Sequence, residues 1–427
     1  MKVLIVGGGG REHAIALKIK ENPEVTALYA APGNGGIAQI ATCLPFKATD
    51  VDGIVRWAAE NKVDFVIVAP DDPLCLGMVD ALAEQGIPAF GPRKNAAIIE
   101  GSKVFSKNLM KKYGIPTAAY ETFDDYDAAV KYLQTADMPI VVKADGLALG
   151  KGVLICPDRE SAVEAVASMM KEAKFGASGA RVVIEEFLTG PEVSVLAFTD
   201  GKTVKPMVSS MDHKRALDHD EGLNTGGMGT IAPNPCYTPE LARRCMDEIF
   251  LPTIAAMNAE GRTFTGCLYF GLMMTPKGPK VIEYNCRFGD PETQVVLPLL
   301  KSDLLTIMRA TVDGTLADTP VEFTSGAACC VVLASGGYPV SYKSGYPISG
   351  LDEAGKTATV FHAGTKLVDG QIVTAGGRVL GVTATADTLE AAIDKAYQAA
   401  DKITFTDMHM RRDIGQRALA SRKESHS

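Results

Sequence analysis

IVVKADGLALGKGVLIC, residues 140–156, places a glycine-rich loop between two runs of β-forming residues. Gly152 follows Lys151, and three residues separate Gly146 from Gly150, so the loop lacks the spacing and the hydroxyl of a P-loop. Because β-rich runs flank it on both sides, the loop is expected to join two strands and to fold as a flap over phosphate groups. Lys143 would then act as a point charge on an α- or β-phosphate. A plain glycine-rich hairpin is the alternative.

Upstream of this loop, residues 1–101 alternate short β-rich runs with amphipathic helical segments, which predicts a doubly wound N-terminal domain with a parallel sheet. The glycine cluster at 7–10 follows the first strand and opens a helix, a place where backbone amides hold phosphate. Glu12 stands where a dinucleotide fingerprint has its third glycine, and residues 30–32 lack the acidic ribose ligand. A smaller phosphate ligand, with Arg11 as a cation, or a tight turn without a ligand therefore remains.

Downstream, residues 102–325 predict an α+β domain that contains a flap subdomain at about 120–190. Glycine turns at 200–201 and 276–278 favour antiparallel strands. Residues 326–427 predict a small β-rich C-terminal domain with a short solvated tail. The length of 427 residues agrees with roughly three domains.

Composition excludes several classes of protein. Apolar residues make up 46% and charged residues 22%, which indicates an ordinary globular chain. The net charge of −8 argues against a surface that binds nucleic acid, and no apolar run is long enough to span a membrane. The nine cysteines show neither zinc-site spacing nor a disulfide pattern, so we interpret them as reduced core residues of a cytoplasmic protein.

The run VIEYNCRFGDPE, residues 281–292, predicts a strand with Glu283, Asn285 and Arg287 on one face. Carboxylate and amide oxygens are hard ligands that suit Mg²⁺ or Mn²⁺ bridging nucleotide phosphates. A polar face turned to water is the alternative. This alternative is less attractive because residues 269–274 and 281–284 are expected to pair as a hairpin in the core. A carboxylate that is buried there needs a cation.

Two further segments carry polar residues suited to ligand binding. The strand at 181–188 ends in acidic residues, and carboxylates there can accept hydrogen bonds from an adenine amino group or from ribose hydroxyls. Residues 212–215 and 224–230 combine charge with exposed backbone amides, which favours binding of an anionic substrate. His213 and His219 are expected to be surface residues of this loop.

The runs DHKR at 212–215, NTGGMG at 224–229 and RFGDPE at 287–292 together resemble the glycinamide ribonucleotide synthetase family of ATP-grasp ligases. The resemblance extends over essentially the whole chain. Residues 7–13, 32–34, 101–103, 143–152 and 185–188 also carry it. It implies a central ATP-grasp domain between the two outer domains.

This resemblance implies an ADP-forming carbon–nitrogen ligase of de novo purine (IMP) biosynthesis. Such an enzyme joins glycine to 5-phospho-D-ribosylamine through a glycyl phosphate, which gives glycinamide ribonucleotide, ADP and phosphate. It requires Mg²⁺ or Mn²⁺. The resemblance also implies a stand-alone protein that is a monomer, with a dimer as the alternative.

The resemblance further implies roles for individual residues. Glu283 and Asn285 would bind the metal, and Arg287, Asp212 and Lys214 would serve catalysis. The residues expected to bind ATP are Lys103, Lys143, Gly150, Lys151, Gly152, Glu185, Glu186, Leu188 and Glu192. Those expected to bind the other substrates are Gly9, Arg11, Glu12, Asn34, Thr225, Gly226, Gly227 and Asp290.

Two rival functions remain open at this point. One is another ATP-grasp ligase, such as a carboxylase that uses bicarbonate. The other is a non-catalytic sensor of a nucleotide or a sugar phosphate that keeps the same fold. An oxidoreductase is disfavoured because Glu12 interrupts the glycine fingerprint and the ribose carboxylate is missing.

Overall fold

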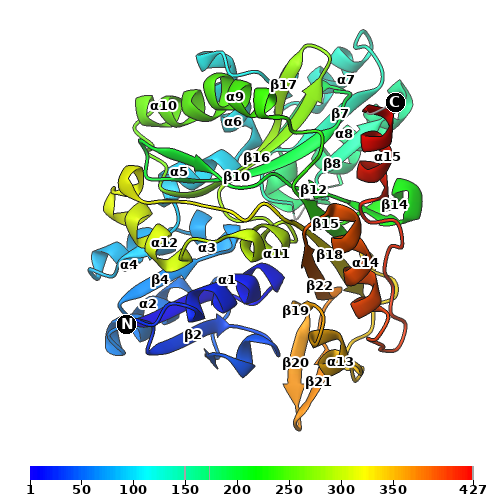
Figure 1. Ribbon diagram of the computed structural model, residues 1–427. Helices are drawn as coiled ribbons and strands as arrows, with labels where there is room; N and C mark the ends of the chain where they lie inside the picture. Colours follow the sequence, from blue (N-terminus) through cyan, green and yellow to red (C-terminus); the bar gives the residue numbers. More distant parts are fainter. Residues whose placement is uncertain (149–150, 173, 426–427) are drawn as a thin grey trace.

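The computed structural model describes residues 1–148, 151–172 and 174–425. Its N-terminal part is the predicted parallel sheet covered by helices, in the strand order β3-β2-β1-β4-β5 (Figure 1). The strands are β1 (Lys2–Gly7), β2 (Ala27–Pro32), β3 (Thr42–Cys43), β4 (Phe65–Val68) and β5 (Ala89–Phe90). The helices are α1 (Gly10–Lys20), α2 (Val51–Glu60), α3 (Asp71–Cys75), α4 (Met78–Glu84) and α5 (Lys94–Gly101). All four residues of β4 are buried, as expected for a parallel strand covered on both faces.

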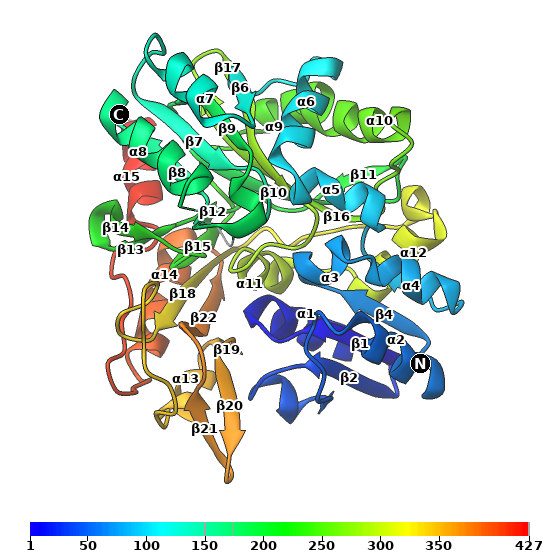
Figure 2. The same cartoon turned by 180° about the vertical axis from the view of Figure 1, so that it is seen from behind.

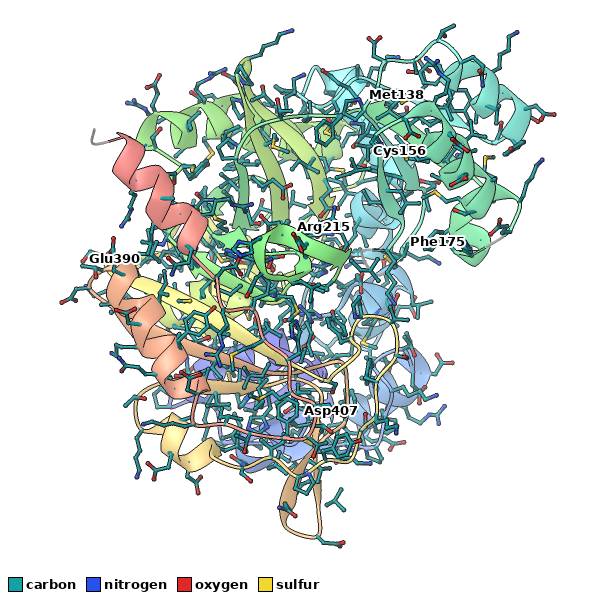
Figure 3. All side chains as sticks on the ribbon, turned by 90° about the vertical axis from the view of Figure 1, so that its right-hand side faces the viewer. Met138, Cys156, Phe175, Arg215, Glu390 and Asp407 are labelled. Atoms are coloured by element: carbon teal, nitrogen blue, oxygen red, sulfur yellow. The ribbon has the colours of Figure 1, made fainter. Side chains whose placement is uncertain are left out.

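The predicted flap is an antiparallel sheet in the order β6-β9-β7-β8, and it forms a lobe of its own (Figure 3). Its strands are β6 (Tyr120–Phe123), β7 (Ile140–Ala144), β8 (Val153–Cys156) and β9 (Val182–Glu186). Helices α7 (Tyr126–Leu133) and α8 (Arg159–Met170) pack with the sheet around a small separate core. β7 and β8 pair as the expected hairpin, with Lys143 opposite Val153. The glycine-rich loop therefore connects two adjacent strands.

A second antiparallel sheet, in the order β11-β10-β16-β17, forms the centre of the molecule. It consists of β10 (Glu192–Thr199), β11 (Val204–Pro206), β16 (Gly266–Thr275) and β17 (Gly278–Asn285). The β16–β17 hairpin confirms the pairing expected for the acidic strand. Helices α6 (Lys103–Tyr113), α9 (Pro239–Cys245) and α10 (Leu251–Ala259) lie above this sheet in Figure 1, and α11 (Thr293–Val296) and α12 (Leu304–Asp313) lie below it.

The third sheet has the order β12-β15-β18-β22-β19 and crosses the expected domain boundary. β18 (Ala327–Ala334), β19 (Thr359–His362) and β22 (Arg378–Ala386) follow residue 325, but β12 (Met211–Asp212) and β15 (Gly229–Ala232) precede it. A domain boundary between 325 and 326 would therefore assign strands of one sheet to two domains. α14 (Leu389–Ala400) packs against β18 and β22.

The remaining elements complete the C-terminal part. They are the hairpins β13 (Arg215–Leu217) with β14 (Glu221–Asn224) and β20 (Thr365–Val368) with β21 (Gln371–Thr374), and the helices α13 (Leu351–Gly355) and α15 (Gln416–Ser425). Residues 422–425 were expected in a solvated tail but belong to α15. α1 contacts β19, so the first helix of the chain lies beside the third sheet (Figure 2). None of the helices in the described ranges is both long and apolar enough to cross a membrane.

Candidate active site

Lys143 lies at the junction between the flap and the central sheet. Its side chain extends from β7, is almost fully buried, and donates a hydrogen bond to the carbonyl oxygen of Ile282 at 3.2 Å. It also forms an ion pair with Glu185 of the neighbouring strand β9, and Lys107 of α6 pairs with the same carboxylate at 2.9 Å. Burial alone would raise the pKa of Glu185, but the two lysines hold it below its usual range. Glu185 therefore fixes the position of Lys143.

Lys103 lies at the base of the glycine-rich loop and is tied to it. Its ammonium group donates to the carbonyl oxygen of Gly146 at 2.9 Å. Asp145 accepts hydrogen bonds from the backbone amide of Val104 at 2.8 Å and from the hydroxyl of Ser102 at 2.9 Å. Burial lowers the pKa of Lys103, and nearby Glu283 opposes this shift. The loop and the start of α6 are thus one connected unit.

Within the glycine-rich loop, Gly150 lies outside the described residues. Lys151 is exposed. A Cβ atom on Gly152 would come within 2.6 Å of the Cβ of Ala148, so only glycine lets the loop close upon itself here.

The other residues expected to bind ATP lie along the segment that connects β9 to β10. Glu186 is exposed, and its carboxylate accepts a hydrogen bond from the amide of Ala119 at 3.2 Å. Leu188 is half-buried, and Glu192 is exposed at the start of β10. The structure therefore groups them next to the strand that carries Glu185, with two carboxylates open to solvent.

The acidic strand β17 carries Glu283 and Asn285 as predicted, and Glu100 of α5 supports it. The side-chain amide of Asn285 donates to Glu100 at 2.9 Å, the backbone amide of Cys286 donates to it at 2.7 Å, and Arg287 pairs with it at 3.1 Å. Burial raises the pKa of Glu100, although Arg287 opposes this. Because the nitrogen of Asn285 is engaged, its side-chain oxygen is left as an available donor to a cation.

The donor set on β17 fits a divalent cation that arrives with phosphate. Glu283 is half-buried, and its carboxylate makes no hydrogen bond or ion pair with any described residue. Over the described ranges, no cluster of three or more His, Cys, Asp or Glu side chains forms a complete metal site. Mg²⁺ is commonly held by one or two carboxylates together with substrate phosphates. One carboxylate and one amide oxygen are therefore a suitable partial site.

Asp212 ends β12 and forms the base of the polar loop. Its carboxylate accepts the backbone amide of His213 at 2.7 Å and lies 3.4 Å from the ammonium group of Lys214. Burial raises the pKa of Asp212 to about 7, against the effect of Lys214 and with a further contribution from Glu292. Asp212 thus titrates near neutral pH.

His213 is buried and not a surface residue, contrary to the expectation from sequence. Its Nδ1 lies 3.1 Å from the carbonyl oxygen of Gly229, and its Nε2 accepts the amide of Gly415 at 3.1 Å. Burial lowers its pKa to about 4. His219 is exposed as expected. His213 is therefore a neutral structural residue that joins the loop to the C-terminal segment.

The glycine pair that follows the loop packs closely against charged side chains. The hydroxyl of Thr225 donates to the carbonyl oxygen of Lys214 at 2.8 Å and accepts the amide of Gly227 at 3.0 Å. Gly227 has a φ of +127°, and a Cβ there would lie 2.7 Å from Asp212. A Cβ on Gly226 would lie 2.8 Å from the guanidinium carbon of Arg378. The positive φ of Gly227 requires glycine, whereas a Cβ on Gly226 would require the end of the Arg378 side chain to move.

In the N-terminal cluster, the side chains of Glu12 and Asn34 are engaged by the protein itself. Glu12 is buried, accepts the amide of Gly9 at 2.8 Å and pairs with Arg11 at 2.8 Å. Asn34 donates to the carbonyl oxygens of Gly8 at 3.0 Å and His362 at 2.8 Å. Both side chains shape the loop, and Arg11 is held with it, because its guanidinium also donates to the carbonyl oxygen of Phe288 at 3.1 Å.

A cavity of about 360 Å³ opens where the N-terminal loop, the acidic segment and the third sheet meet. Asp290 lines it, accepts the amide of Arg11 at 3.3 Å and lies 3.7 Å from the guanidinium of Arg378. Burial alone would raise the pKa of Asp290, but Arg378 and Arg11 hold it below its usual range. The lining residues are Gly8, Gly9, Gly33, Asn34, Asp290, Tyr338, Ala363, Gly364, Thr365, Ala375 and Arg378.

Three residues of the site were not predicted from the sequence. Glu100, Tyr338 and Arg378 show no local motif, because each reaches the site from an element distant in the chain. Arg378 donates to the backbone oxygen of Asp290 at 2.9 Å, and the hydroxyl of Tyr338 accepts the amide of Gly226 at 3.1 Å. Only the fold brings them to the site.

Comparison with protein families matches the three parts of the chain in order. The N domain of phosphoribosylglycinamide synthetase matches residues 1–100, its ATP-grasp (A) domain matches residues 101–293, and its C domain matches residues 328–417. The predicted fold class, with an ATP-grasp domain between two outer domains, is confirmed.

Known proteins named phosphoribosylamine–glycine ligase resemble the chain over its full length. The protein of Halalkalibacterium halodurans is 49% identical, with 100% of this chain and 99% of that protein covered. The protein of Rhodopirellula baltica is also 49% identical, with 98% of each covered.

Solved structures agree with these sequence comparisons. The crystal structure of phosphoribosylamine–glycine ligase from Thermotoga maritima has a TM-score of 0.86 and 34% identity, and covers 97% of this chain and 100% of that one. The biotin carboxylase domain of Hydrogenobacter thermophilus 2-oxoglutarate carboxylase, at 18% identity and a TM-score of 0.72, covers 96% and 91% and shares the fold alone. The chain thus belongs to the phosphoribosylglycinamide synthetase family.

Proposed function

We propose that the protein joins glycine to 5-phosphoribosylamine at the expense of ATP and releases glycinamide ribonucleotide, ADP and phosphate. One observation carries this proposal: Lys103 lies near Lys143 and Glu283, and Lys214 lies near Glu283 and Asp212, so the flap junction, the acidic strand and the polar loop converge on one region. The cavity beside Asp290 adjoins this region. A ligase that uses a triphosphate, an amino acid and a sugar phosphate needs these three subsites.

The nucleotide subsite lies at the flap junction. The buried Lys143 and the half-buried Lys103 would contact the phosphates, and Glu185 and the carbonyl oxygen of Gly146 hold them in place. Glu186, Leu188 and Glu192 would bind adenine and ribose. Lys151 and Gly152 belong to the flap that covers the phosphates, and we extend this role to Gly150.

Glu283 and the side-chain oxygen of Asn285 would hold Mg²⁺ or Mn²⁺. When bound, this ion neutralises charge on the phosphate oxygens and so lowers the barrier to attack by a carboxylate. Glu100 holds the amide of Asn285 by its nitrogen, so that the oxygen is presented to the cation. The same glutamate holds Arg287, which leaves the guanidinium beside the acidic strand.

The glycine subsite lies between the polar loop and β17. Asp212 is an acceptor for an ammonium group, and Lys214 and Arg287 are cations suited to a carboxylate. Thr225, Gly226 and Gly227 supply backbone groups beside Asp212. A zwitterion such as glycine needs this combination of one anion with two cations.

The phosphoribosylamine subsite is the cavity beside Asp290. The loop around Gly9 opens α1, where the helix dipole favours a phosphate, and a phosphate there would compete with Glu12 and Asp290 for the amides of Gly9 and Arg11. Arg11 and Arg378 supply positive charge, and Asp290 accepts hydrogen bonds. Glu12 and Asn34 hold the loop that carries these amides.

The reaction follows in two displacements. A carboxylate oxygen of glycine attacks the γ-phosphorus of ATP, the bond to the β-phosphate oxygen breaks, and ADP leaves. The amino group of phosphoribosylamine then attacks the carbonyl carbon of the glycyl phosphate, loses a proton and expels phosphate. Lys143 and Lys103 offset the charge of the phosphates, and the closed flap keeps water away from the reactive anhydride.

The same proposal sets the protein in de novo purine biosynthesis in the cytoplasm, acting as a monomer, with a dimer as the alternative. Its direct test measures ADP formation by the purified protein with ATP and Mg²⁺. Glycine and freshly generated phosphoribosylamine are added separately and together. ADP and the amide are expected only with both. ADP formation that depends on bicarbonate and not on glycine would contradict the proposal, as would ATP binding without turnover.

A further inference from the structure

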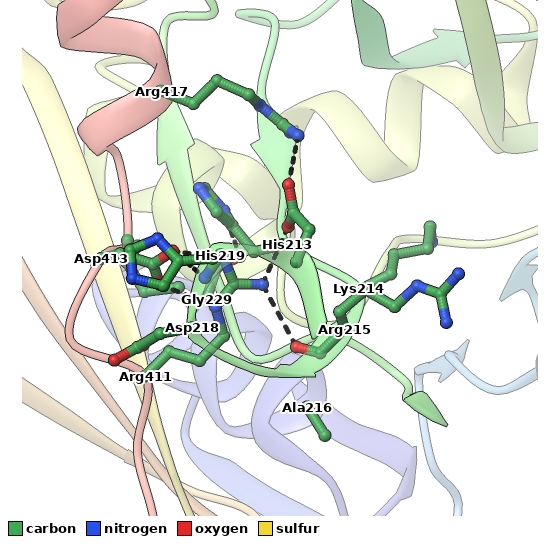
Figure 4. A network of polar contacts seen from close by, with 12 residues as sticks. His213, Lys214, Arg215, Ala216, Asp218, His219, Gly229, Arg411, Asp413 and Arg417 are labelled. Carbon is green, nitrogen blue, oxygen red and sulfur yellow. Dashed lines mark hydrogen bonds and ion pairs between the residues drawn. The ribbon is translucent and has the colours of Figure 1, made fainter. Parts of the chain in front are cut away.

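The loop that carries Asp212 and Lys214 is held from outside by the segment at 409–417. The imidazole of His409 lies 2.7 Å from the carbonyl oxygen of Ala216, and the amide of His219 donates to Asp413 at 2.9 Å. Gly415 donates to His213 as described above. The β13–β14 hairpin is thus bound by side chains and backbone of one continuous segment (Figure 4).

Arg411 is the centre of these contacts. Its side chain is 1% exposed, and its guanidinium forms a fork with Asp413 through hydrogen bonds of 2.8 and 2.9 Å. The remaining nitrogen donates to the carbonyl oxygen of Arg215 at 3.2 Å and to Asp220 at 3.1 Å. Both of the latter acceptors lie in the hairpin region, and Arg215 directly follows Lys214. Arginine presents donors in a rigid fork that lysine cannot reproduce.

Arg411 lies on the other side of the hairpin from the Lys214 side chain, which belongs to the proposed glycine subsite. Figure 4 shows it on the side of the hairpin that faces the C-terminal segment, whereas Lys214 extends away from it. Lys214 lies beside Asp212, because its ammonium group is 3.4 Å from the carboxylate of Asp212. A movement of the hairpin would therefore displace Lys214 and leave the nucleotide subsite, which lies on β7, β9 and α6, unchanged.

We propose that Arg411 is a positioning residue for glycine. Its hydrogen bonds to Arg215 and Asp220 hold the β13–β14 hairpin so that Lys214 stays beside Asp212. This proposal rests on the proposed ligase function. It predicts that loss of these contacts affects the binding of glycine and not that of ATP, because the described residues that Arg411 contacts lie in the hairpin region and in its own segment.

Two neighbouring positions provide matched tests. Arg412 follows Arg411 in the same segment, but its side chain is 57% exposed and pairs with Asp401, not with the hairpin. Arg412→Met is therefore the control for loss of one arginine. Asp220 is 42% exposed on the hairpin side. Asp220→Asn therefore weakens the contact with Arg411 and creates no cavity in the core.

The experiment measures the KM values for glycine and ATP and the thermal midpoint for Arg411→Lys, Asp220→Asn and Arg412→Met. The first two are expected to raise the KM for glycine roughly ten- to a hundredfold, since small displacements are costly at a reaction centre. Their KM for ATP and both KM values of Arg412→Met are expected to stay within about twofold of the wild type, as for surface changes. Equal effects on glycine and ATP, or none on glycine, would overturn the proposal.

Hydrogen exchange of the full-length protein gives a second readout that needs no turnover. Amides at 213–224 are expected to exchange faster in Arg411→Lys and Asp220→Asn, with the amides of β7 and β9 unchanged. Unaltered exchange at 213–224 would overturn the proposal even if the wild-type protein proved not to be this ligase. Conversely, a wild type whose ADP formation ignores glycine would refute the ligase function, and the exchange data would still decide whether Arg411 holds the hairpin.

Discussion

At the scale of single residues, the two glutamates at β17 have different roles: Glu283 is free to bind a cation, and Glu100 supports the strand. Glu283 has no hydrogen-bond or ion-pair partner among the described residues, whereas Glu100 satisfies Asn285, Cys286 and Arg287 together. A half-buried carboxylate without a partner is costly unless a cation joins it. The difference between these two glutamates therefore predicts different responses to substitution.

For Glu283→Gln, we expect ADP formation to fall about a hundredfold or more, because metal-assisted charge neutralisation contributes several kcal/mol. The free energy of unfolding without nucleotide should not decrease, since no hydrogen bond or ion pair with a described residue is lost and a half-buried charge is removed. Steady-state kinetics and urea denaturation measure the two effects. Glu84→Gln, at an exposed position of α4, is the matched control. Full activity of Glu283→Gln would refute the metal role.

The acidity of Asp212 predicts a pH dependence of glycine use. Burial raises its pKa to about 7, so the carboxylate becomes protonated as the pH falls through neutrality. Because the anion is the form that accepts an ammonium group, kcat/KM for glycine should fall below about pH 7, by up to tenfold per pH unit. A pH profile of the wild type and of Asp212→Asn tests this. An inflection that persists in Asp212→Asn would assign it to another group.

Residue identities were predictable where chemistry is local. Lys143 and Glu283 each sit on a strand whose alternation is visible in the sequence, and the structure places them as the pattern indicates. For Glu12 and Asn34, which are expected to contact substrate, the structure adds a second role: their side chains hold the loop, because polar groups near a helix start bind its backbone. Arg378 could not be predicted, since its contacts with Asp290 join segments far apart in the chain.

At the scale of elements, the glycine-rich loop and α6 act together through Asp145. Asp145→Ala removes the acceptor of the Val104 amide and of the Ser102 hydroxyl and the ion pair with Arg181, which should destabilise the protein by about 1 kcal/mol or more. It should also raise the KM for ATP roughly tenfold, since Lys103 is displaced with the loop. Asp158→Ala removes the N-cap of α8 in the same lobe and is the matched control. Its stability loss should be about 1 kcal/mol, and an equal rise in its KM for ATP would contradict the specific role of Asp145.

Elements were predictable where one local pattern decides them, as in the β7–β8 and β16–β17 hairpins. The third sheet shows the limit of this reasoning. β12 and β15 are separated from β18 by about a hundred residues of chain, and the pairing of Thr230 with Cys330 leaves no periodic signal in either segment. The helix α15 was likewise missed, because its strongly polar run resembles a solvated end.

At the scale of the whole molecule, buried neutral histidines tie distant parts of the chain together. The backbone amide of His362 donates to Nδ1 of His13 at 2.8 Å, which joins the third sheet to α1. Burial lowers the pKa of His13 to about 3 and that of His362 to about 4. An unfolded histidine titrates near 6.5, so between that value and about 4 the unfolded state alone binds protons. The stability present above pH 6.5 is therefore lost as the pH falls.

His13→Asn tests this linkage and keeps an acceptor for the His362 amide. Between pH 7 and pH 5 its free energy of unfolding should decrease by about 2 kcal/mol less than that of the wild type, from the pKa difference of one histidine. Urea denaturation at the two pH values gives the comparison. Equal pH dependence in both proteins would mean that His13 is not held neutral in the fold.

The central claim for the whole molecule is that flap junction, acidic strand and polar loop cooperate to phosphorylate the carboxylate of glycine. The most direct measurement supplies glycine labelled with ¹⁸O in its carboxylate and analyses the released phosphate by mass spectrometry. Attack by the carboxylate on the γ-phosphorus, followed by cleavage of the carbon–oxygen bond, predicts one ¹⁸O atom in each phosphate. Phosphate free of ¹⁸O, formed together with the amide, would contradict the account.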